Sequence, residues 1–438
     1  MALAGLSCIP FTGTSPIMKS ASSTIAIETR PGRFGRRPVF PIRPILPILC
    51  AALLPLLPAG APAAEQGHAA DVLLRFVDRH LVAGAVTLVA TRDQVLGVEA
   101  VGYSDLASLK PMRTDDLFWI ASMTKSMTCA ALMILVDEGK IRIDDPVEKY
   151  LPELHNQWVV AESDGDHALW KRPQHPITVK NLLTHTSGFV PRSAIEHPKV
   201  DFIPLRNLIP SFVMAPLRFE PGSKYEYCNA GMNTAGRLIE VASGLGYGDF
   251  MEQRLFRPLG MTHTTFWPTE EQLKTLAKTY NFNADKSELV EAAIEPFTYP
   301  LTDRTRQPLP AGGAFSTAGD LARFCQMLLG GGVIDGKRIL SEDAVHQMTS
   351  VETGDIKLNG NDSEGYGFGL VVKRKPGAEG LSAGSFGHRG AYKTSMWIDP
   401  EKNRILIYLI QHSGSFSGTD GGKMEAMFEK AALERYHD

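Results

Sequence analysis

A serine and a lysine three positions apart are the strongest candidates for chemistry in this sequence. Ser122 and Lys125 stand at the predicted start of a helix, directly after an apolar stretch at residues 118–121. Residues three apart share one face of a helix, so the Lys125 amine is expected beside the Ser122 hydroxyl. A free serine is a weak nucleophile, and an adjacent amine can accept its proton. The alternative is a helix-capping serine with a solvated lysine.

A tyrosine and an asparagine form the second candidate element. Tyr227 and Asn229 lie between a predicted turn at residues 220–223 and a predicted helix. A tyrosine hydroxyl held beside a lysine ammonium group can carry protons to and from a nucleophile. The Asn229 amide can hydrogen-bond a substrate amide or Lys125. The alternative is a tyrosine that only packs at a helix start.

The third candidate element is a predicted strand that contains His388. Residues 388–389 are flanked by two glycines, one of which is Gly390. A glycine has no side chain, so another backbone segment or a substrate can come close to it. The N–H of Ala391 is predicted to complete an oxyanion hole with the N–H of Ser122, where the helix start adds positive potential. His388 is predicted to orient the substrate. Residues 393–395, Lys-Thr-Ser, are a rival for this role, and a plain surface strand is the alternative to both.

Two further patterns are weaker candidates. Residues 380–384, Gly-Leu-Ser-Ala-Gly, match the turn that carries the nucleophile in α/β-hydrolases. That turn needs a strand before it and a helix after it, whereas here a loop precedes the pattern and a strand is predicted to follow. Residues 163–165, Ser-Asp-Gly, lie in a polar segment and are predicted to form a turn.

Hydrophobic periodicity predicts the elements that would position these residues. Helices are predicted at residues 70–82, 123–138, 229–243, 317–329 and 423–436, and strands at 85–90, 94–103, 385–388, 393–398 and 404–411. The polar segment 155–176 is predicted to be a surface loop or insertion. Strands near both ends with helices between them predict one α/β (α+β) domain over 70–435. Its α/β part would comprise 70–121 and 311–435, with a mostly helical part at 122–310.

In this order the three elements resemble the serine β-lactamase-related family, in particular class C β-lactamases, family VIII carboxylesterases and D-amino-acid-specific peptidases. Four further stretches are similar to that family: residues 181–188, 219–222, 312–317 and 366–369. The resemblance implies an antiparallel sheet flanked by helices, an additional all-helical domain, and a site between the two. It also implies an acyl-enzyme mechanism without metal or cofactor.

The third motif departs from the family pattern. His388 stands where typical lactamases have the lysine of Lys-Thr-Gly or Lys-Ser-Gly, and histidine there is found among esterase-like members. This weakens the expectation that a β-lactam carboxylate is recognised, unless Arg389 faces inward and supplies the charge. The resemblance also implies that His185 is structural.

Composition excludes several classes of function. A formal net charge of −3 over 438 residues argues against a nucleic-acid-binding protein. The twelve histidines show no spacing typical of a zinc site. A hydrophobic content of 44% is enough for a large core in one or two domains. Three cysteines lie beyond residue 64, and their odd number and wide spacing predict buried thiols rather than disulfides.

Residues 1–64 have the pattern of an export signal. They contain six basic residues and one acidic residue, then an apolar run at 45–57 and small residues at 61–64. This order is typical of a signal with an Ala-x-Ala cleavage site, and the run is too short and too rich in proline to span a bilayer. We predict a periplasmic or secreted protein with no stable membrane span after cleavage. A disordered tail rich in proline and arginine is the alternative.

These observations predict a serine hydrolase that acts on a small ester, amide or peptide through an acyl-enzyme. The predicted catalytic residues are Ser122, Lys125 and Tyr227, and the predicted substrate-binding residues are Asn229, His388, Gly390 and Ala391. Carboxylesterase-like activity is favoured. D-amino-acid peptidase and β-lactamase activity are the enzymatic alternatives, and an inactive penicillin-binding-like sensor is the non-enzymatic one.

Overall fold

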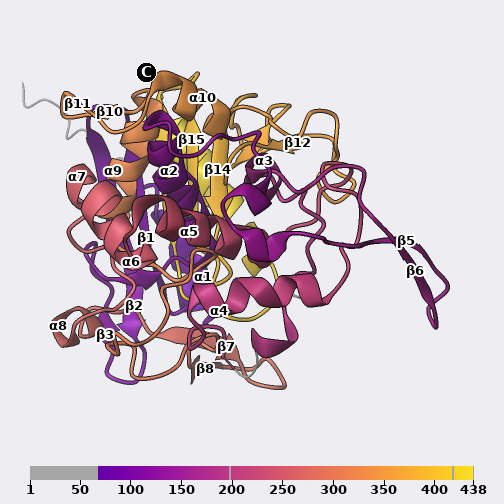
Figure 1. The fold of residues 1–438 in the computed structure, drawn as a ribbon. Helices are drawn as coiled ribbons and strands as arrows, with labels where there is room; N and C mark the ends of the chain where they lie inside the picture. Colours follow the sequence, from indigo (N-terminus) through magenta and orange to yellow (C-terminus); the bar gives the residue numbers. More distant parts are fainter. Residues whose placement is uncertain (1–67, 197–198, 417–418, 438) are drawn as a thin grey trace, which may run out of the picture. The chain divides into compact units, whose positions relative to one another are not determined.

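An antiparallel sheet of eight strands, in the order β12-β13-β14-β15-β16-β1-β2-β3, lies at the centre of the computed structural model, which describes residues 68–196, 199–416 and 419–437. Its strands are β1 (Gly84–Ala90), β2 (Val95–Asp105), β3 (Lys110–Pro111), β12 (Glu364–Tyr366), β13 (Val371–Lys373), β14 (Phe386–Arg389), β15 (Ser395–Asp399) and β16 (Arg404–Leu409). β1 pairs with β16, so both ends of the chain build one sheet, drawn indigo and yellow in Figure 1. An α+β fold on an antiparallel sheet is thus confirmed.

Both faces of the sheet are covered, which explains why its central strands are apolar at almost every position. Successive side chains of a strand point to opposite faces. In β1, Ala85 and Val89 pack with the terminal helices, whereas Val86 and Leu88 join the core on the other face. Every residue of β1 is therefore buried.

The helices divide between these faces. α1 (Asp71–Asp78) and α11 (Met424–Arg435) pack on each other, and α11 also packs on β16. On the opposite face α9 (Ala318–Leu329) packs on β1, β15 and β16, and α2 (Thr124–Asp137) packs on α5 (Asn229–Ser243). The remaining α-helices are α3 (Val179–Leu183), α4 (Leu205–Leu208), α6 (Tyr247–Phe250), α7 (Arg257–Leu259), α8 (Glu270–Leu273) and α10 (Glu342–Thr349).

Smaller strand pairs join distant parts of the chain. They are β4 (Phe118–Trp119) with β9 (Phe315–Ser316), β5 (Val159–Ser163) with β6 (Ala168–Lys171), β7 (Thr279–Phe282) with β8 (Leu289–Ala292), and β10 (Val333–Ile334) with β11 (Lys337–Arg338). The β4–β9 pair matters for the site, because it brings the segment before Ser122 beside residues 311–314.

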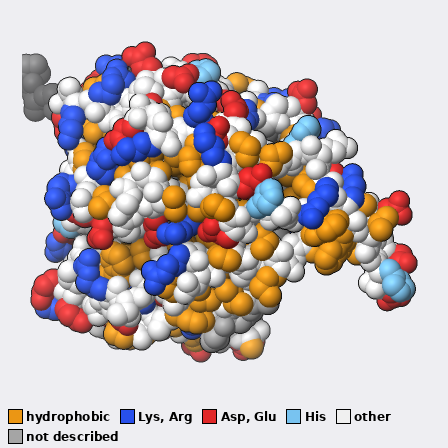
Figure 2. All heavy atoms as spheres, viewed as in Figure 1, with side chains coloured by type: hydrophobic (Ala, Val, Ile, Leu, Met, Phe, Trp, Pro, Cys, Tyr) orange, Lys and Arg blue, Asp and Glu red, His pale blue; other side chains and the backbone are white. Residues whose placement is uncertain are grey.

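The segment 155–176, predicted as a surface loop or insertion, contains an exposed hairpin whose strands the sequence pattern did not reveal. β5 and β6 project at the right of Figure 1. The hairpin is anchored at its base, where Val159 is buried and bridges to Leu217 and where Lys171, at the end of β6, pairs with Glu220 at 2.8 Å. The other residues of both strands are at least partly exposed, so they lack the alternation that signals a strand. Figure 2 shows hydrophobic side chains along this projection and charged ones towards its end.

The export signal predicted at residues 1–64 lies outside the described residues, and the division into α/β and helical parts stays a prediction. In the described ranges no helix is both long and apolar enough to cross a membrane. Cys129, Cys228 and Cys325 are buried free thiols, as predicted.

Candidate active site

Ser122 stands at a sharp change from strand to helix. The chain leaves β4, passes through Ile120 and enters a 3₁₀ turn, η1 (Ala121–Met123), that continues directly into α2. Ala121 has a φ of 46°, a left-handed conformation that is unfavourable for a residue with a side chain. Such strain is found where surrounding structure holds a functional residue in place. Here the strained turn places Ser122 at the N-terminus of α2, where the serine is half-buried and lines a pocket.

Lys125 lies one turn further on, with its side chain fully buried. Its Nζ donates to Ser122 Oγ at 3.0 Å and to the carbonyl oxygen of Ala311 at 2.5 Å. The Ala311 N–H in turn donates to Asn233 Oδ1 on α5 at 3.2 Å. The amine is therefore held against the serine hydroxyl by an acceptor from a distant segment, which the sequence patterns did not reveal.

Tyr227 closes the other side of Lys125. It immediately precedes Cys228, the N-cap of α5, and Lys125 Nζ lies 4.7 Å from the centre of its ring. The ring also lies 4.5 Å from the His185 ring. Tyr227 keeps 37% of its surface exposed, so a substrate can reach it. Serine, lysine and tyrosine thus meet at one place, although 102 residues separate Lys125 from Tyr227.

Asn229, the first residue of α5, lines the same pocket as Ser122. The sequence allowed a hydrogen bond between Asn229 and Lys125. The described residues do not form it. The side chain is left facing the pocket, where a substrate would lie.

His388 lies on β14 with both ring nitrogens engaged by the protein. Nε2 lies 3.1 Å from the Tyr366 hydroxyl, and Nδ1 lies 2.7 Å from the carbonyl oxygen of Arg389. Burial, and then the positive charge of Lys125, lowers the pKa of His388 to about 3. A neutral imidazole with both nitrogens engaged offers a substrate neither a cation nor a free hydrogen-bonding atom, and the predicted role of His388 in orienting the substrate stays a prediction.

Arg389 cannot supply that missing charge. Side chains alternate along β14, so Arg389 points to the opposite face of the sheet, where its Nε contacts both oxygens of Glu425 on α11 at 2.9 Å. The rival Lys393 also turns away, with its Nζ 6.0 Å from the Phe416 ring centre.

Gly390 is required by a close approach of two chain segments. A β-carbon at this position would lie 2.6 Å from the Ile120 carbonyl oxygen and 2.1 Å from Thr394 Oγ1. This contact brings Ala391 beside Ser122 in the lining of one pocket. Neither the Ser122 N–H nor the Ala391 N–H donates to another residue in the described part of the chain. Both are available to an oxyanion, as an oxyanion hole requires.

The pocket beside Ser122 has a volume of about 170 Å³. Its apolar wall consists of Trp119, Pro191, Val200, Pro296, Phe297 and Leu309. The Trp119 and Phe297 rings meet edge to face with their centres 5.3 Å apart. The lining also contains two residues of opposite charge, the exposed Arg192 and the buried Glu196.

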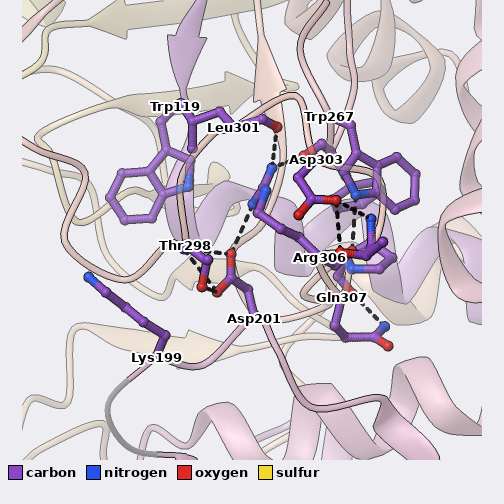
Figure 3. Close-up of polar contacts among 12 residues, drawn as sticks. Trp119, Lys199, Asp201, Trp267, Thr298, Leu301, Asp303, Arg306 and Gln307 are labelled. Carbon is purple, nitrogen blue, oxygen red and sulfur yellow. Dashed lines mark hydrogen bonds and ion pairs between the residues drawn. The ribbon is translucent and has the colours of Figure 1, made fainter. Parts of the chain in front are cut away.

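A buried ion pair fixes the two loops that carry this wall. Figure 3 shows Arg306 extended between Asp201 and the carbonyl of Leu301. Arg306 Nη1 lies 3.0 Å from Asp201 Oδ2, and Asp201 also accepts the N–H and hydroxyl of Thr298. Because both charges are almost fully buried, removing one would leave the other uncompensated, at a cost of about 3–5 kcal/mol.

The two weaker sequence candidates form no site. Ser382 lies between β13 and β14, where its N–H donates to Asp399, and no helix follows it. Residues 163–165 lie at the turn of the β5–β6 hairpin, where Asp164 Oδ1 accepts the N–H groups of Asp166 and His167. Within the described residues no group of three histidine, cysteine or acidic side chains is arranged to hold a metal ion.

Residues 69–425 match the family model described as Beta-lactamase. The chain belongs to this family. Family members are serine hydrolases, with esterases, peptidases and acyltransferases among the similar proteins. The family resemblance predicted from the three motifs is thereby confirmed, together with the prediction of a serine hydrolase.

Similar proteins span several activities within the family. Esterase EstB of Burkholderia gladioli is 28% identical over 394 residues, covering 83% of this chain and 94% of that protein. The D-alanyl-D-alanine-carboxypeptidase/endopeptidase AmpH of Escherichia coli is 28% identical over 377 residues, covering 83% and 89%. The structure of EstCE1, a hydrolase with promiscuous acyltransferase activity, superposes with a TM-score of 0.69 at 23% identity, covering 83% and 97%.

Proposed function

We propose that the protein is an esterase that cleaves short acyl esters through an acyl-enzyme on Ser122. The observation that carries this proposal is the 3.0 Å contact between Lys125 Nζ and Ser122 Oγ at the edge of a small, mostly apolar pocket. The pocket is smaller than the roughly 300–1,000 Å³ typical of ligand sites, which favours a short acyl group.

The reaction would proceed in two halves. Ser122 Oγ attacks the ester carbonyl while Lys125 and Tyr227 take up its proton, and the N–H groups of Ser122 and Ala391 bind the oxyanion. The C–O bond to the alcohol breaks, and the alcohol leaves with the proton that the pair had accepted. Water then loses a proton to the same pair and attacks the acyl carbonyl, which releases the acid and restores the serine hydroxyl.

The groups on β14 favour esters over β-lactams. A lactam carboxylate would need a fixed cation at the position of His388, which is neutral and fully engaged, while Arg389 lies on the other face of the sheet. A hydrogen bond to a charged group contributes about 1.5–3 kcal/mol. Its absence would lower kcat/KM for cephalosporins by about one to two powers of ten.

A peptidase is the second candidate, because Arg192 lines the pocket and could meet the carboxylate of a peptide terminus. AmpH, a carboxypeptidase, is similar over most of this chain. The inactive-sensor alternative is disfavoured by the meeting of serine, lysine and tyrosine.

A substrate panel on the purified protein tests these proposals. Short p-nitrophenyl esters, a chromogenic cephalosporin and a D-alanyl-D-alanine peptide are compared by kcat/KM, with Ser122→Ala as the blank. Ester turnover well above the other two supports the esterase. Efficient cephalosporin or peptide hydrolysis with little ester turnover would contradict it.

We also infer export to the periplasm or the medium, because residues 1–64 follow the order of a cleaved signal. Amino-terminal sequencing of the mature protein should begin close to residue 65. An intact amino terminus in the cytoplasmic fraction would contradict this inference.

A further inference from the structure

His185, Tyr366 and His388 form a continuous chain of hydrogen bonds next to the proposed catalytic pair. His185 Nε2 lies 3.2 Å from the Tyr366 hydroxyl oxygen, which lies 3.1 Å from His388 Nε2. All three side chains are buried. They come from three separate segments: the loop after α3, the end of β12, and β14.

The partners at the two ends determine which Nδ1 atom carries a proton. The Cys228 backbone N–H can only donate, so His185 Nδ1, at 3.2 Å, carries no proton. The Arg389 carbonyl can only accept, so His388 Nδ1, at 2.7 Å, carries one. His185 therefore donates through Nε2–H to the Tyr366 hydroxyl, and this hydroxyl donates to His388 Nε2 because burial, with a pKa lowered to about 3, keeps His388 neutral. Both imidazoles are neutral, and they are opposite tautomers.

The charged groups around the two imidazoles also keep them neutral. Burial, followed by the charge of Lys125 from α2, lowers the pKa of both histidines. Arg389, on the same strand as His388, acts in the same direction. The other groups that face the pair are the tyrosine rings of Tyr225 and Tyr227.

We propose that His185, Tyr366 and His388 form a positioning network that fixes the Tyr227 segment onto β14. At one end His185 contacts the Tyr227 ring and holds the Cys228 N–H at the start of α5. At the other end His388 holds the Arg389 carbonyl, two residues before Ala391. The network thus sets the distance between the proton carrier and the oxyanion hole.

The backbone of His185 supports this role. Its φ of 58° lies in the left-handed region, which is uncommon for any residue other than glycine. A residue persists there when surrounding contacts hold it, and such residues cluster at functional sites. These three residues are positioning residues, and their effect on turnover rests on the proposed function.

The hydrogen-bond directions can be tested without any substrate. Nitrogen-15 NMR of imidazole-labelled protein distinguishes the two neutral tautomers, and His185→Gln and His388→Gln variants assign the signals. His185 should carry its proton on Nε2 and His388 on Nδ1, with neither ring titrating between pH 5 and 8. Identical tautomers, or an ordinary titration near pH 6.5 for either ring, would overturn the network.

The Tyr366→Phe variant tests the effect on turnover. It removes only the hydroxyl, so His185 Nε2–H loses its acceptor and His388 Nε2 becomes free to take a proton. We expect kcat to fall by about tenfold to 100-fold with little change in KM, and the acid limb of the kcat profile to move to higher pH. Wild-type kcat and pH profile in a variant with a normal melting transition would contradict the positioning role.

Tyr225→Phe is the matched control. Tyr225 is also buried and its ring packs on those of His185 and Tyr366, but its hydroxyl has no hydrogen-bond partner among the described residues. Its removal should leave kcat and the pH profile unchanged, and equal losses in both variants would show a packing effect instead. If the wild-type protein hydrolyses no ester, the proposed function fails, while the NMR result still decides the network.

Discussion

Replacing Phe297 with alanine is expected to lengthen the acyl group that the pocket accepts. Phe297 is almost fully buried and lines the pocket together with Ser122. Its ring packs against those of Trp119 and Phe315, with centres 5.3 Å and 5.8 Å away. Without the ring, a longer chain can lie against the apolar wall that remains.

The size of the effect follows from the apolar surface that the longer chain buries. Each buried methylene contributes about 0.8 kcal/mol, which is about a factor of four in kcat/KM. If the space left by the ring admits two or three methylenes, the preference for the longer ester rises by about 16-fold to 64-fold. The same substitution should lower the free energy of unfolding by about 3–5 kcal/mol.

The assay compares kcat/KM for p-nitrophenyl esters from acetate to octanoate in wild-type and Phe297→Ala protein. Phe428→Ala is the control, because Phe428 is equally buried but lies on α11, on the opposite face of the sheet. The control should lose stability and keep the wild-type ester profile. An unchanged profile in folded Phe297→Ala, or the same shift in both variants, would refute the assignment of this wall to the acyl group.

Two further predictions concern the proton carriers and a buried acid. Lys125→Ala and Tyr227→Phe should each lower kcat by about 100-fold or more. The double variant should lose much less kcat than the product of the two single losses, because the effects of groups that act as a unit are not additive. A loss equal to that product would contradict a coupled pair. Burial, reinforced by Glu425, raises the pKa of Glu429 on α11 to about 9 from an ordinary 4.5. Between these two pH values the folded state keeps a proton that the unfolded chain releases. The free energy of unfolding therefore falls as the pH rises from 4.5 to about 9. Urea unfolding should therefore show that Glu429→Gln gains stability over wild type from pH 5 to pH 8, and a parallel pH dependence of the two proteins would contradict this.

The parts of the site that lie on one element were predictable from the sequence. Ser122 and Lys125 come together because helix geometry places residues three apart on one face, and α5 occupies the predicted residues 229–243. The outward direction of Arg389 was also available in the sequence, since side chains alternate along a strand and His388 was expected to face inward.

Contacts between distant segments could not be predicted in this way. The Ala311 carbonyl reaches Lys125 from 186 residues away, and the His185–Tyr366 bond spans 181 residues. Periodicity describes one element at a time and carries no information on which loops meet. The hairpin at β5 and β6 was missed for a different reason: most of its side chains are solvent-exposed, so no buried face imposes an alternating pattern.

The central claim is that Ser122 is the residue that becomes acylated. Treating the protein with a fluorophosphonate probe and mapping the adduct by mass spectrometry tests it directly. The geometry predicts one adduct on the peptide that contains Ser122 and no labelling of the Ser122→Ala variant. An adduct on Ser382, or undiminished labelling of Ser122→Ala, would contradict it.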